Sequence, residues 1–483
     1  MSMKIYQQTA ELLRKQILDQ QLRPGDPLPS IRELSTRLNI GRNSVIHAYM
    51  LLEDEQLIEP RPRSGYYVRA RPLSPNTSAR PEPRRVELGA TALEIIGAAQ
   101  NARLVPLGSA DPEAHGSARE YFYRRLSRHA RDAASTSSGN SHYVAPPGLH
   151  DLRAQLARRF NSTLVQAGAD DIVITNGAQE AITLALLALA RPGDTLAVES
   201  PCYYGTLQCI EALGMRALEI PSHPQHGMDM EALSEALTCW PVKAILTNPS
   251  FSNPTGACSP VADRQALLRL AAEHDLPIIE DDVFGELYHQ GSRPAPIKAF
   301  DTQGRVLLCS SLSKTLDSDI RIGWIMPGRY FEQVNYLKYV TTLASPGILQ
   351  RAGADFLADN RYERHLRQVR RRYQARLGLL LEAIYQYWPA AAVPLTPKGG
   401  FLCWVELPIG FDGDQLYRDA QQAGIGITPG SLFASDMRFS HCIRLNYSTF
   451  EATPYYLQAI KTLGELIRRQ LSTPLPGEPS GHY

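Results

Sequence analysis

The sequence lacks the features that would place it in a membrane or outside the cell. It has no signal peptide and no run of about eighteen apolar residues. Its seven cysteines are scattered, odd in number and never spaced as a metal-binding pair, which indicates reduced thiols. No repeat of the solenoid type is present. We therefore expect a cytosolic protein with no metal site, neither secreted nor inserted in a membrane.

The sequence also lacks an excess of charge of one sign. Its 50 Lys and Arg face 49 Asp and Glu, which leaves a net charge of +1. Affinity for a polyanion such as DNA would therefore have to come from local patches. A length of 483 residues with 43% hydrophobic composition is ample for one large and one small domain.

A lysine in a serine-rich loop is the strongest sign of chemistry. Lys314 follows the apolar run 306–309, which is typical of a buried strand. Burial near a cation such as Arg321 would lower the pKa of the amine, as a Schiff-base lysine requires. The alternative is a solvated loop lysine, which this motif alone does not exclude.

Two further strand ends carry groups that a pyridoxal ring needs. The predicted strand 244–247 leads into a loop in which the Asn253 amide could donate to the 3-oxygen of the ring. The apolar residues 276–279 lead to Asp281, whose carboxylate could pair with the pyridine nitrogen and keep it protonated. A strand-end carboxylate is often only a helix cap. The order Asn253, Asp281, Lys314 nevertheless predicts a pyridoxal phosphate site.

The sequence also offers a cradle for the phosphate. A predicted strand, 172–175, is followed by a turn at Gly177 and an apolar helix, 181–190. Backbone N–H groups at a helix N-terminus favour an anion. A single glycine turn before a helix is also an ordinary strand-to-helix connection. Ser311 and Arg321 add a hydroxyl and a guanidinium that could converge on the same phosphate.

The first seventy residues follow a different pattern. Ser30 and Glu33 form a predicted capping box at the start of one helix, and a second helix is expected from Arg42. This is helix-turn-helix spacing, and the segment 57–68 predicts a hairpin with a basic tip, or wing. A helical protein-docking module is the alternative, because residues 1–70 hold ten basic and eight acidic side chains.

These motifs carry a family resemblance over nearly the whole chain. Residues from about 105 to 470 resemble a fold-type I aminotransferase domain, and the first seventy resemble a GntR-type winged helix. Their combination resembles the MocR/GabR family of bacterial regulators. It implies an α/β fold-type I PLP-dependent transferase domain with an N-terminal winged helix-turn-helix domain. The expected parts are a DNA-binding domain (1–70), a linker (71–88), a PLP-binding domain (89–472; large domain about 140–350, small domain mainly 351–472) and a flexible tail (473–483).

The resemblance also implies roles for individual residues. Pyridoxal 5'-phosphate would be held as a Schiff base by Lys314, with Asp281 on the ring nitrogen, Asn253 on the ring oxygen and Tyr203 stacked on the ring. Its phosphate would be bound by Gly177, Ala178, Gln179, Ser311 and Arg321. Tyr143 resembles the tyrosine that reaches the phosphate of the partner subunit, which implies a homodimer, head-to-tail. Arg444 resembles the arginine that grips the carboxylate of an amino-acid substrate or effector.

The winged helix implies double-stranded operator DNA as a partner. The residues expected to face DNA are Arg32, Arg42, Asn43, Ser44, His47 and Gly65.

The sequence departs from the aminotransferase pattern at two places. Phe284 stands where many relatives have a tyrosine, so the ring oxygen would lose a phenolic donor and the bound Schiff base would have a raised pKa. Asp317 and Asp319 stand where relatives often have Pro-Gly. Two acids there could weaken phosphate binding, or merely face solvent.

Three functions fit these features. The first, which we favour, is a PLP-dependent transcriptional regulator that responds to an amino acid or amine. The second is an active aminotransferase that converts an amino acid to a 2-oxo acid. The third is a regulator that senses pyridoxal phosphate itself.

Overall fold

The structure, a computed structural model, describes most of the chain. The described residues are 5–18, 22, 26–38, 40–54, 57–61, 65–68, 81–89, 93, 95, 97, 101, 103–113, 116–135, 142–162, 164–359 and 361–472. The tip of the predicted wing (62–64), most of the predicted linker (71–80) and the predicted tail (473–483) lie outside the described residues.

The N-terminal residues form a helical unit with a small hairpin. Its elements are α1 (Ile5–Leu18), α2 (Ile31–Leu38), α3 (Arg42–Asp54), β1 (Ile58–Arg61) and β2 (Gly65–Val68). The cap of α2 is present, since the backbone N–H of Glu33 donates to Ser30 Oγ at 3.2 Å. The helix-turn-helix and hairpin predicted from the sequence are confirmed, whereas α1, which packs on α3, was not foreseen.

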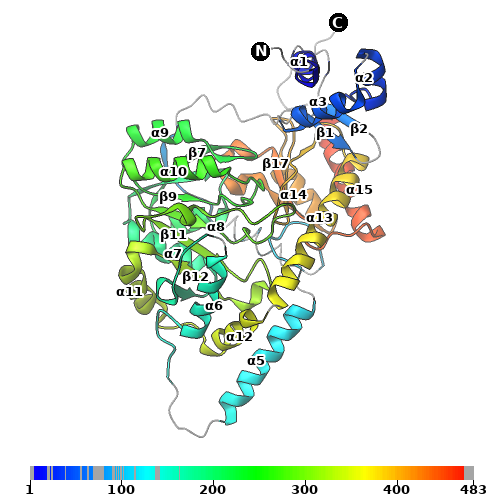
Figure 1. Ribbon diagram of the computed structural model, residues 1–483. Helices are drawn as coiled ribbons and strands as arrows, with labels where there is room; N and C mark the ends of the chain where they lie inside the picture. The colour runs from blue at the N-terminus through cyan, green and yellow to red at the C-terminus, as the bar shows by residue number, and fades with distance from the viewer. Residues whose placement is uncertain are drawn as a thin grey trace.

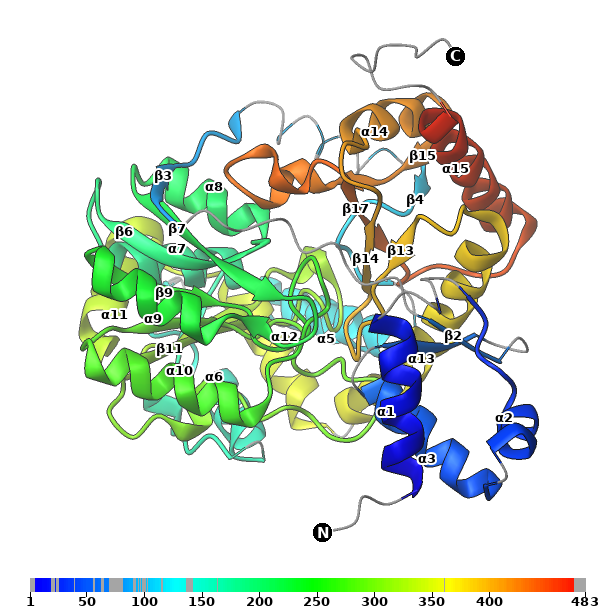
Figure 2. The same cartoon turned by 90° about the horizontal axis from the view of Figure 1, so that it is seen from above.

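The core of this unit explains the spacing of apolar residues in α3. Val45, Ala48, Tyr49 and Leu52 are fully buried. They lie on one face of the helix, so its other face is left open to solvent. In both views the unit lies at one end of the molecule, beside α13 (Figures 1 and 2).

The centre of the remaining chain is a nine-stranded mixed sheet. Its strand order is β3-β7-β6-β9-β10-β11-β12-β5, with β8 paired to β7. Strands β7, β6, β9, β10 and β11 run parallel, whereas β12 is antiparallel to both of its neighbours. The strands are β3 (Pro83–Arg85), β5 (Val173–Thr175), β6 (Thr195–Ser200), β7 (Arg216–His223), β8 (Gly227–Met228), β9 (Val242–Thr247), β10 (Ile278–Asp281), β11 (Val306–Ser311) and β12 (Gly323–Met326).

Helices cover both faces of this sheet, and neighbouring residues of a strand point to opposite sides. On β6, for example, Leu196 packs with residues of α7 and α8, whereas Ala197 packs with residues of α9 and α10 (Figure 1). The helices of this part of the chain are α6 (His150–Asn161), α7 (Ala178–Leu189), α8 (Tyr204–Ala212), α9 (Met230–Cys239), α10 (Val261–Glu273), α11 (Phe331–Thr342) and α12 (Gly347–Ala358). Helix α5 (Ser117–Ser135) packs on α12 and extends away from the sheet (Figure 1).

The C-terminal part adds a smaller sheet beside the large one (Figure 2). Its strand order is β13-β14-β17-β16, and a separate pair joins β15 to β4. The elements are β4 (Val105–Pro106), β13 (Val393–Pro394), β14 (Leu402–Glu406), β15 (Ile425–Gly426), β16 (Thr428–Pro429), β17 (Cys442–Asn446), α13 (Arg361–Tyr387), α14 (Gly413–Gln422) and α15 (Pro454–Ser472).

The C-terminal end of the predicted linker belongs to the large sheet. Residues 83–85 form β3, which pairs antiparallel with the edge strand β7. Arg84 forms an ion pair with Asp436, and Val86 is buried in the core. The expected linker (71–88) is therefore too long at this end, because its last residues gain ladder hydrogen bonds and bury an apolar side chain.

Two expectations from composition can be compared with the structure. All seven cysteines are free. Within the described part of the chain, every helix is too short or too polar to cross a bilayer.

Candidate functional site

Three polar residues predicted from the sequence meet at one edge of the large sheet. β9, β10 and β11 are parallel, so their carboxyl ends lie together. Asn253 and Lys314 follow two of these ends, and Asp281 is the last residue of the strand between them. All three line one cavity, together with Asp111, Ala178, Gln179, Ile182, Tyr203, Val283, Phe284, Ser311, Ser313, Ser318 and Arg321.

Asp281 is a buried carboxyl group with few donors around it. The backbone N–H of Val283 donates to its Oδ1 at 3.3 Å. Burial raises the pKa of Asp281 to about 7, and the neighbouring carboxyl of Asp282 acts in the same direction. A cationic partner in the cavity would reverse this effect, because an opposite charge favours the ionised carboxylate.

Lys314 has the electrostatic setting expected of a reactive amine. Its Nζ donates to the carbonyl oxygen of Ala110 at 2.7 Å. Burial lowers the pKa of Lys314, and the cations Arg444 and Arg321 lower it further, while Asp111 and Asp281 oppose them. A lowered pKa increases the fraction of neutral, nucleophilic amine near neutral pH.

Hydrogen bonds fix both the backbone and the side chain of Asn253. Its backbone N–H donates to Asn248 Oδ1 at 2.9 Å, and Asn248 Nδ2 donates to the carbonyl oxygen of Asp281 at 2.5 Å. Arg444 Nη1 donates to Asn253 Oδ1 at 3.0 Å. With its oxygen occupied, the Asn253 side chain has its Nδ2 hydrogens left as donors.

Arg444 lies behind Asn253 on β17 and does not line the cavity itself. Its side chain is almost fully buried, and Nη2 donates to the carbonyl oxygen of Gly108 at 2.6 Å and to Thr428 Oγ1 at 3.1 Å. Its Nε is buried and makes no hydrogen bond with the described residues. Burial lowers the pKa of Arg444. A buried guanidinium with a donor to spare fits an anionic ligand such as a carboxylate.

The predicted phosphate cradle contains a close contact that only glycine permits. Gly177, with φ +85°, precedes the N-terminus of α7, and a Cβ there would lie 2.4 Å from Arg321 Nη2. The guanidinium is fixed further by bonds to the carbonyl oxygen of Asn176 at 3.1 Å and to Ser313 Oγ at 3.3 Å. Arginine N–H groups and the start of a helix therefore meet at one end of the cavity.

Other residues that were predicted to contact the cofactor line the same cavity. Ala178 is the first residue of α7, and Gln179 Nε2 donates to the carbonyl oxygen of Gly205 at 2.8 Å. Ser311 ends β11, and its Oγ accepts from the N–H of Ser313 at 3.3 Å. Tyr203 lies directly before α8, where a Cβ on Gly205 would clash with its ring at 2.5 Å.

Two predicted residues have different surroundings. Phe284 lines the cavity and is 1% exposed, packed against Phe401 with 5.3 Å between ring centroids. Tyr143 is 77% exposed and does not line the cavity of its own chain. Its expected contact with a partner subunit stays a prediction.

The two acids near Lys314 differ from each other. Asp319 is exposed, as expected of a solvated acid. Asp317 is buried and does not line the cavity, so of the two alternatives for these acids the solvent-facing one does not apply to this residue. Its carboxylate is bound instead by Arg119 and Tyr123 of α5.

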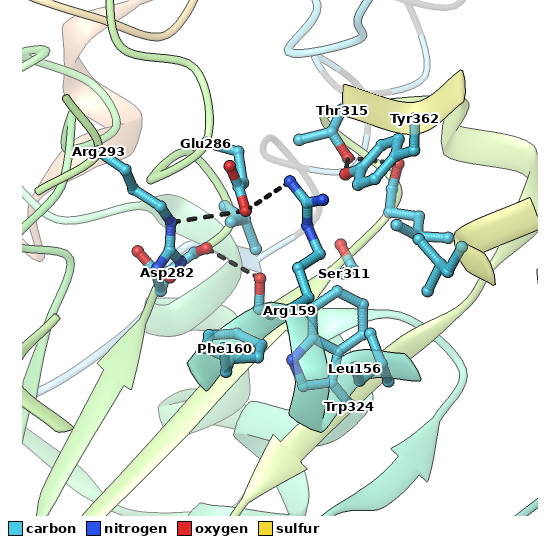
Figure 3. Close-up of a pocket in the computed structure, with 14 residues that line it drawn as sticks. Leu156, Arg159, Phe160, Asp282, Glu286, Arg293, Ser311, Thr315, Trp324 and Tyr362 are labelled. Carbon is cyan, nitrogen blue, oxygen red and sulfur yellow. Dashed lines mark hydrogen bonds and ion pairs between the residues drawn. The ribbon is translucent and has the colours of Figure 1, made fainter. Parts of the chain in front are cut away.

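A second cavity shares the wall formed by Val283 and Ser311 (Figure 3). Its lining includes four charged side chains, of which Asp282 is bound by Arg293, and Glu286 accepts from Arg159 Nη2 at 3.0 Å. The charge of Asp282 is thereby compensated by its own arginine. Asp281, next to it in the chain, makes no ion pair with a described residue; the Lys314 amine only lowers its pKa from a distance, so its carboxylate is available to a group within the first cavity.

Three of the residues predicted to face DNA lie on the exposed face of α3. Arg42, Asn43 and His47 are exposed, whereas Ser44 is half-buried and His47 lies against the ring of Tyr6. Arg32 on α2 and Gly65, with φ +98° at the start of β2, are exposed as well.

The same face also has two exposed apolar side chains, Ile46 and Met50. Neither residue was predicted from the sequence, although Ile46 follows Arg42 by four residues and Met50 follows Ile46 by four, which places all three on one helix face. Apolar side chains on a recognition helix can contact thymine methyl groups.

Part of the cavity wall was not predicted from the sequence. Ser313 belongs to the lysine motif and could have been found from it. Asp111 and Ser318 also line the cavity, but Asp111 comes from an irregular segment with no local signal.

Comparisons with known proteins match the two parts of the chain to two families. The family model for aminotransferase class I and II matches residues 113–460, and that for the gntR family of bacterial regulatory proteins matches residues 5–68. YjiR of Escherichia coli K12, an uncharacterized HTH-type transcriptional regulator, is 38% identical over 472 residues, covering 96% of this chain and 99% of that protein.

Two further proteins extend the comparison. The HTH-type transcriptional regulator TauR of Rhodobacter capsulatus is 29% identical over 463 residues, covering 91% of this chain and 92% of its own. The crystal structure of Pyrococcus horikoshii kynurenine aminotransferase, in complex with PMP, superposes with a TM-score of 0.73 at 28% identity. That match covers 80% of this chain and 96% of the other.

These findings confirm the resemblance and the fold class predicted from the sequence, and they indicate pyridoxal phosphate as the cofactor. The chain belongs to the aminotransferase class I and II family and, through its N-terminal GntR-type winged helix, to the MocR/GabR family of transcriptional regulators.

Proposed function

We propose that this protein is a DNA-binding transcriptional regulator that holds pyridoxal phosphate on Lys314 and responds to an amino acid or amine. The observation that carries the proposal is the cavity in which Lys314, Asp281 and Asn253 meet, in a chain that also presents the open face of α3. The cavity supplies a chemical sensor, and the helix supplies a reader of DNA.

The residues of the cavity fit the cofactor group by group. When bound, pyridoxal phosphate supplies an aldehyde that condenses with amines and a ring that withdraws electrons when its nitrogen is protonated. Lys314 offers the amine, Asp281 the carboxylate for the ring nitrogen and Asn253 Nδ2 a donor for the ring oxygen. Arg321 and the start of α7 offer positive charge and N–H groups for the phosphate.

Arg444 supports a ligand with a carboxylate. It is buried, it contacts Asn253, and its Nε–H has no hydrogen-bond partner in the described part of the chain. An amino acid whose amine reaches the cofactor would bring its carboxylate towards this side of the site. The ligand carboxylate would replace Asn253 Oδ1 as the acceptor of the Arg444 Nη1–H group, or would accept from Arg444 beside it.

We further propose that the protein acts as a cytoplasmic head-to-tail homodimer. The exposed Tyr143 would then complete the phosphate site of the partner subunit, and two winged helices would bind repeated or inverted half-sites of an operator. Ligand binding would change how the two winged helices are held relative to each other.

Two other functions have an observation in their favour. The lowered pKa of Lys314 suits an amine that also moves protons during turnover, which favours an active aminotransferase. Arg444 lies outside the cavity wall, which favours a regulator that senses the cofactor alone.

The test is a binding measurement with DNA from upstream of the chain's own coding sequence. DNA affinity is measured without cofactor, with pyridoxal phosphate, and with the cofactor plus a panel of amino acids and amines. The proposal expects affinity to change when a particular amino compound is added. A change with the cofactor alone would support cofactor sensing, and multiple-turnover formation of a 2-oxo acid without DNA binding would support the aminotransferase.

A further inference from the structure

Asp317 has an unusual environment for an acid beside a phosphate site. Its side chain is buried, and both carboxylate oxygens accept hydrogen bonds. Oδ1 accepts from the backbone N–H of Asp319 at 2.9 Å. Oδ2 accepts from Arg119 Nε at 2.5 Å and from the Tyr123 hydroxyl at 3.1 Å.

On one side, these bonds fix the short turn that leads to Arg321. Asp317 caps the 3₁₀ turn Ser318–Ile320, and Arg321 follows it with φ +51°, in the left-handed region that costs a non-glycine residue energy. From this backbone the Arg321 side chain reaches Asn176 and Ser313 at the end of the cavity. The position of the Arg321 guanidinium therefore depends on the conformation of a turn that is stabilised by the hydrogen bonds of Asp317.

On the other side, the bonds attach this turn to a long helix. Arg119 and Tyr123 are one turn apart on α5, and the Arg119 guanidinium lies over the Tyr123 ring at 4.7 Å. The helix α5 packs along α12. Asp317 thus connects the phosphate turn to α5, and through it to α12, by bonds to residues almost two hundred positions away in the sequence.

We propose that Asp317 is a positioning residue that raises the affinity for the phosphate group of the cofactor by tying the turn before Arg321 to α5. The inference rests on the proposed function, in which this cavity holds pyridoxal phosphate. This effect of Asp317 on phosphate affinity is opposite in sign to the effect of simple charge repulsion between the carboxylate and the phosphate. If Asp317 acted only as a nearby negative charge, its neutralisation would tighten phosphate binding, whereas a positioning role means that neutralisation weakens it.

The chain offers a matched control. Asp319 carries the same charge two residues away, but its side chain is exposed. Asp319→Asn therefore removes an equal charge from the same turn without breaking the connection between Asp317 and α5.

The experiment compares two probes on the full-length protein freed of cofactor. Pyridoxal phosphate and pyridoxal, which lacks the phosphate, are titrated by visible absorbance into the unchanged protein, Asp317→Asn, Arg119→Gln and Asp319→Asn. We expect the dissociation constant for pyridoxal phosphate to rise about tenfold in Asp317→Asn and Arg119→Gln. Affinity for pyridoxal should stay the same, and Asp319→Asn should match the unchanged protein.

Several results would overturn the inference. These are unchanged or tighter binding of pyridoxal phosphate by Asp317→Asn, or an equal loss of affinity for both probes. If Asp317→Asn does not fold, Arg119→Gln decides, because the Arg119 side chain is 38% exposed and its replacement leaves Asp317 in place. Absence of pyridoxal phosphate binding by the unchanged protein would instead refute the proposed function, and this inference with it.

Discussion

Neutralising Asp281 should stabilise the protein without its cofactor. Burial raises the pKa of Asp281 from its ordinary value of 3.8 to about 7. The folded chain therefore holds this proton more tightly than the unfolded chain, so its stability falls as the pH rises from about 4 to about 7. Above pH 7 the ionised Asp281 destabilises the folded state by about 4 kcal/mol, because each unit of difference between the folded and unfolded pKa is worth about 1.4 kcal/mol. Asp281→Asn removes this cost.

The assay is urea unfolding of the cofactor-free domain at several pH values. At pH 8 we expect Asp281→Asn to be more stable than the unchanged protein by up to about 4 kcal/mol, with the difference shrinking towards pH 4. The exposed Asp319→Asn serves as a control and should show no such dependence. The same Asp281 variant should bind pyridoxal phosphate more weakly, because the ring nitrogen loses its partner. A variant that is less stable than the unchanged protein at pH 8 would refute the reasoning.

Three further predictions concern the cradle, the ring and the DNA. Gly177→Ala should weaken pyridoxal phosphate binding by tenfold or more, because a Cβ would lie 2.4 Å from Arg321. The control is Gly193→Ala, since Gly193 has a similar φ of +90° but open space around it, and this variant should bind the cofactor normally. Equal losses of affinity in the two variants would show that the contact with Arg321 does not matter. Phe284→Tyr should lower the pKa of the bound Schiff base, read from a pH titration of visible absorbance, and superimposable titration curves would exclude a role for the missing hydroxyl. Arg42→Ala should weaken operator binding by about tenfold and reduce its salt dependence, and an unaltered footprint would argue against the proposed docking of α3.

The parts of the site that the sequence could predict are those encoded by short motifs. Lys314, Asp281 and Asn253 each follow an apolar run, and the structure shows β11, β10 and β9 at these runs. Because parallel strands end at the same edge, the order of the motifs was enough to predict that these residues meet. The amphipathic spacing in α3 likewise predicted which face is buried and which is open.

The remaining contacts join residues that no local pattern connects. Lys314 donates to Ala110, and Asp317 is bound by Arg119; each pair lies about two hundred residues apart and meets only through the packing of the whole domain. The strand β3 was not foreseen for a similar reason. It is short and rich in proline and arginine, and only the exposed edge of β7 makes it a strand.

We expect the cofactor on Lys314 to transmit a chemical signal to the DNA-binding unit. The most direct measurement is operator affinity of the unchanged protein and of Lys314→Ala, each with and without the amino compound that is active in the panel, while the cofactor spectrum is recorded. We expect Lys314→Ala to lose the Schiff-base absorbance and the response to the ligand but still to bind the operator. A Lys314→Ala protein that responds to the ligand as the unchanged protein does would contradict this expectation.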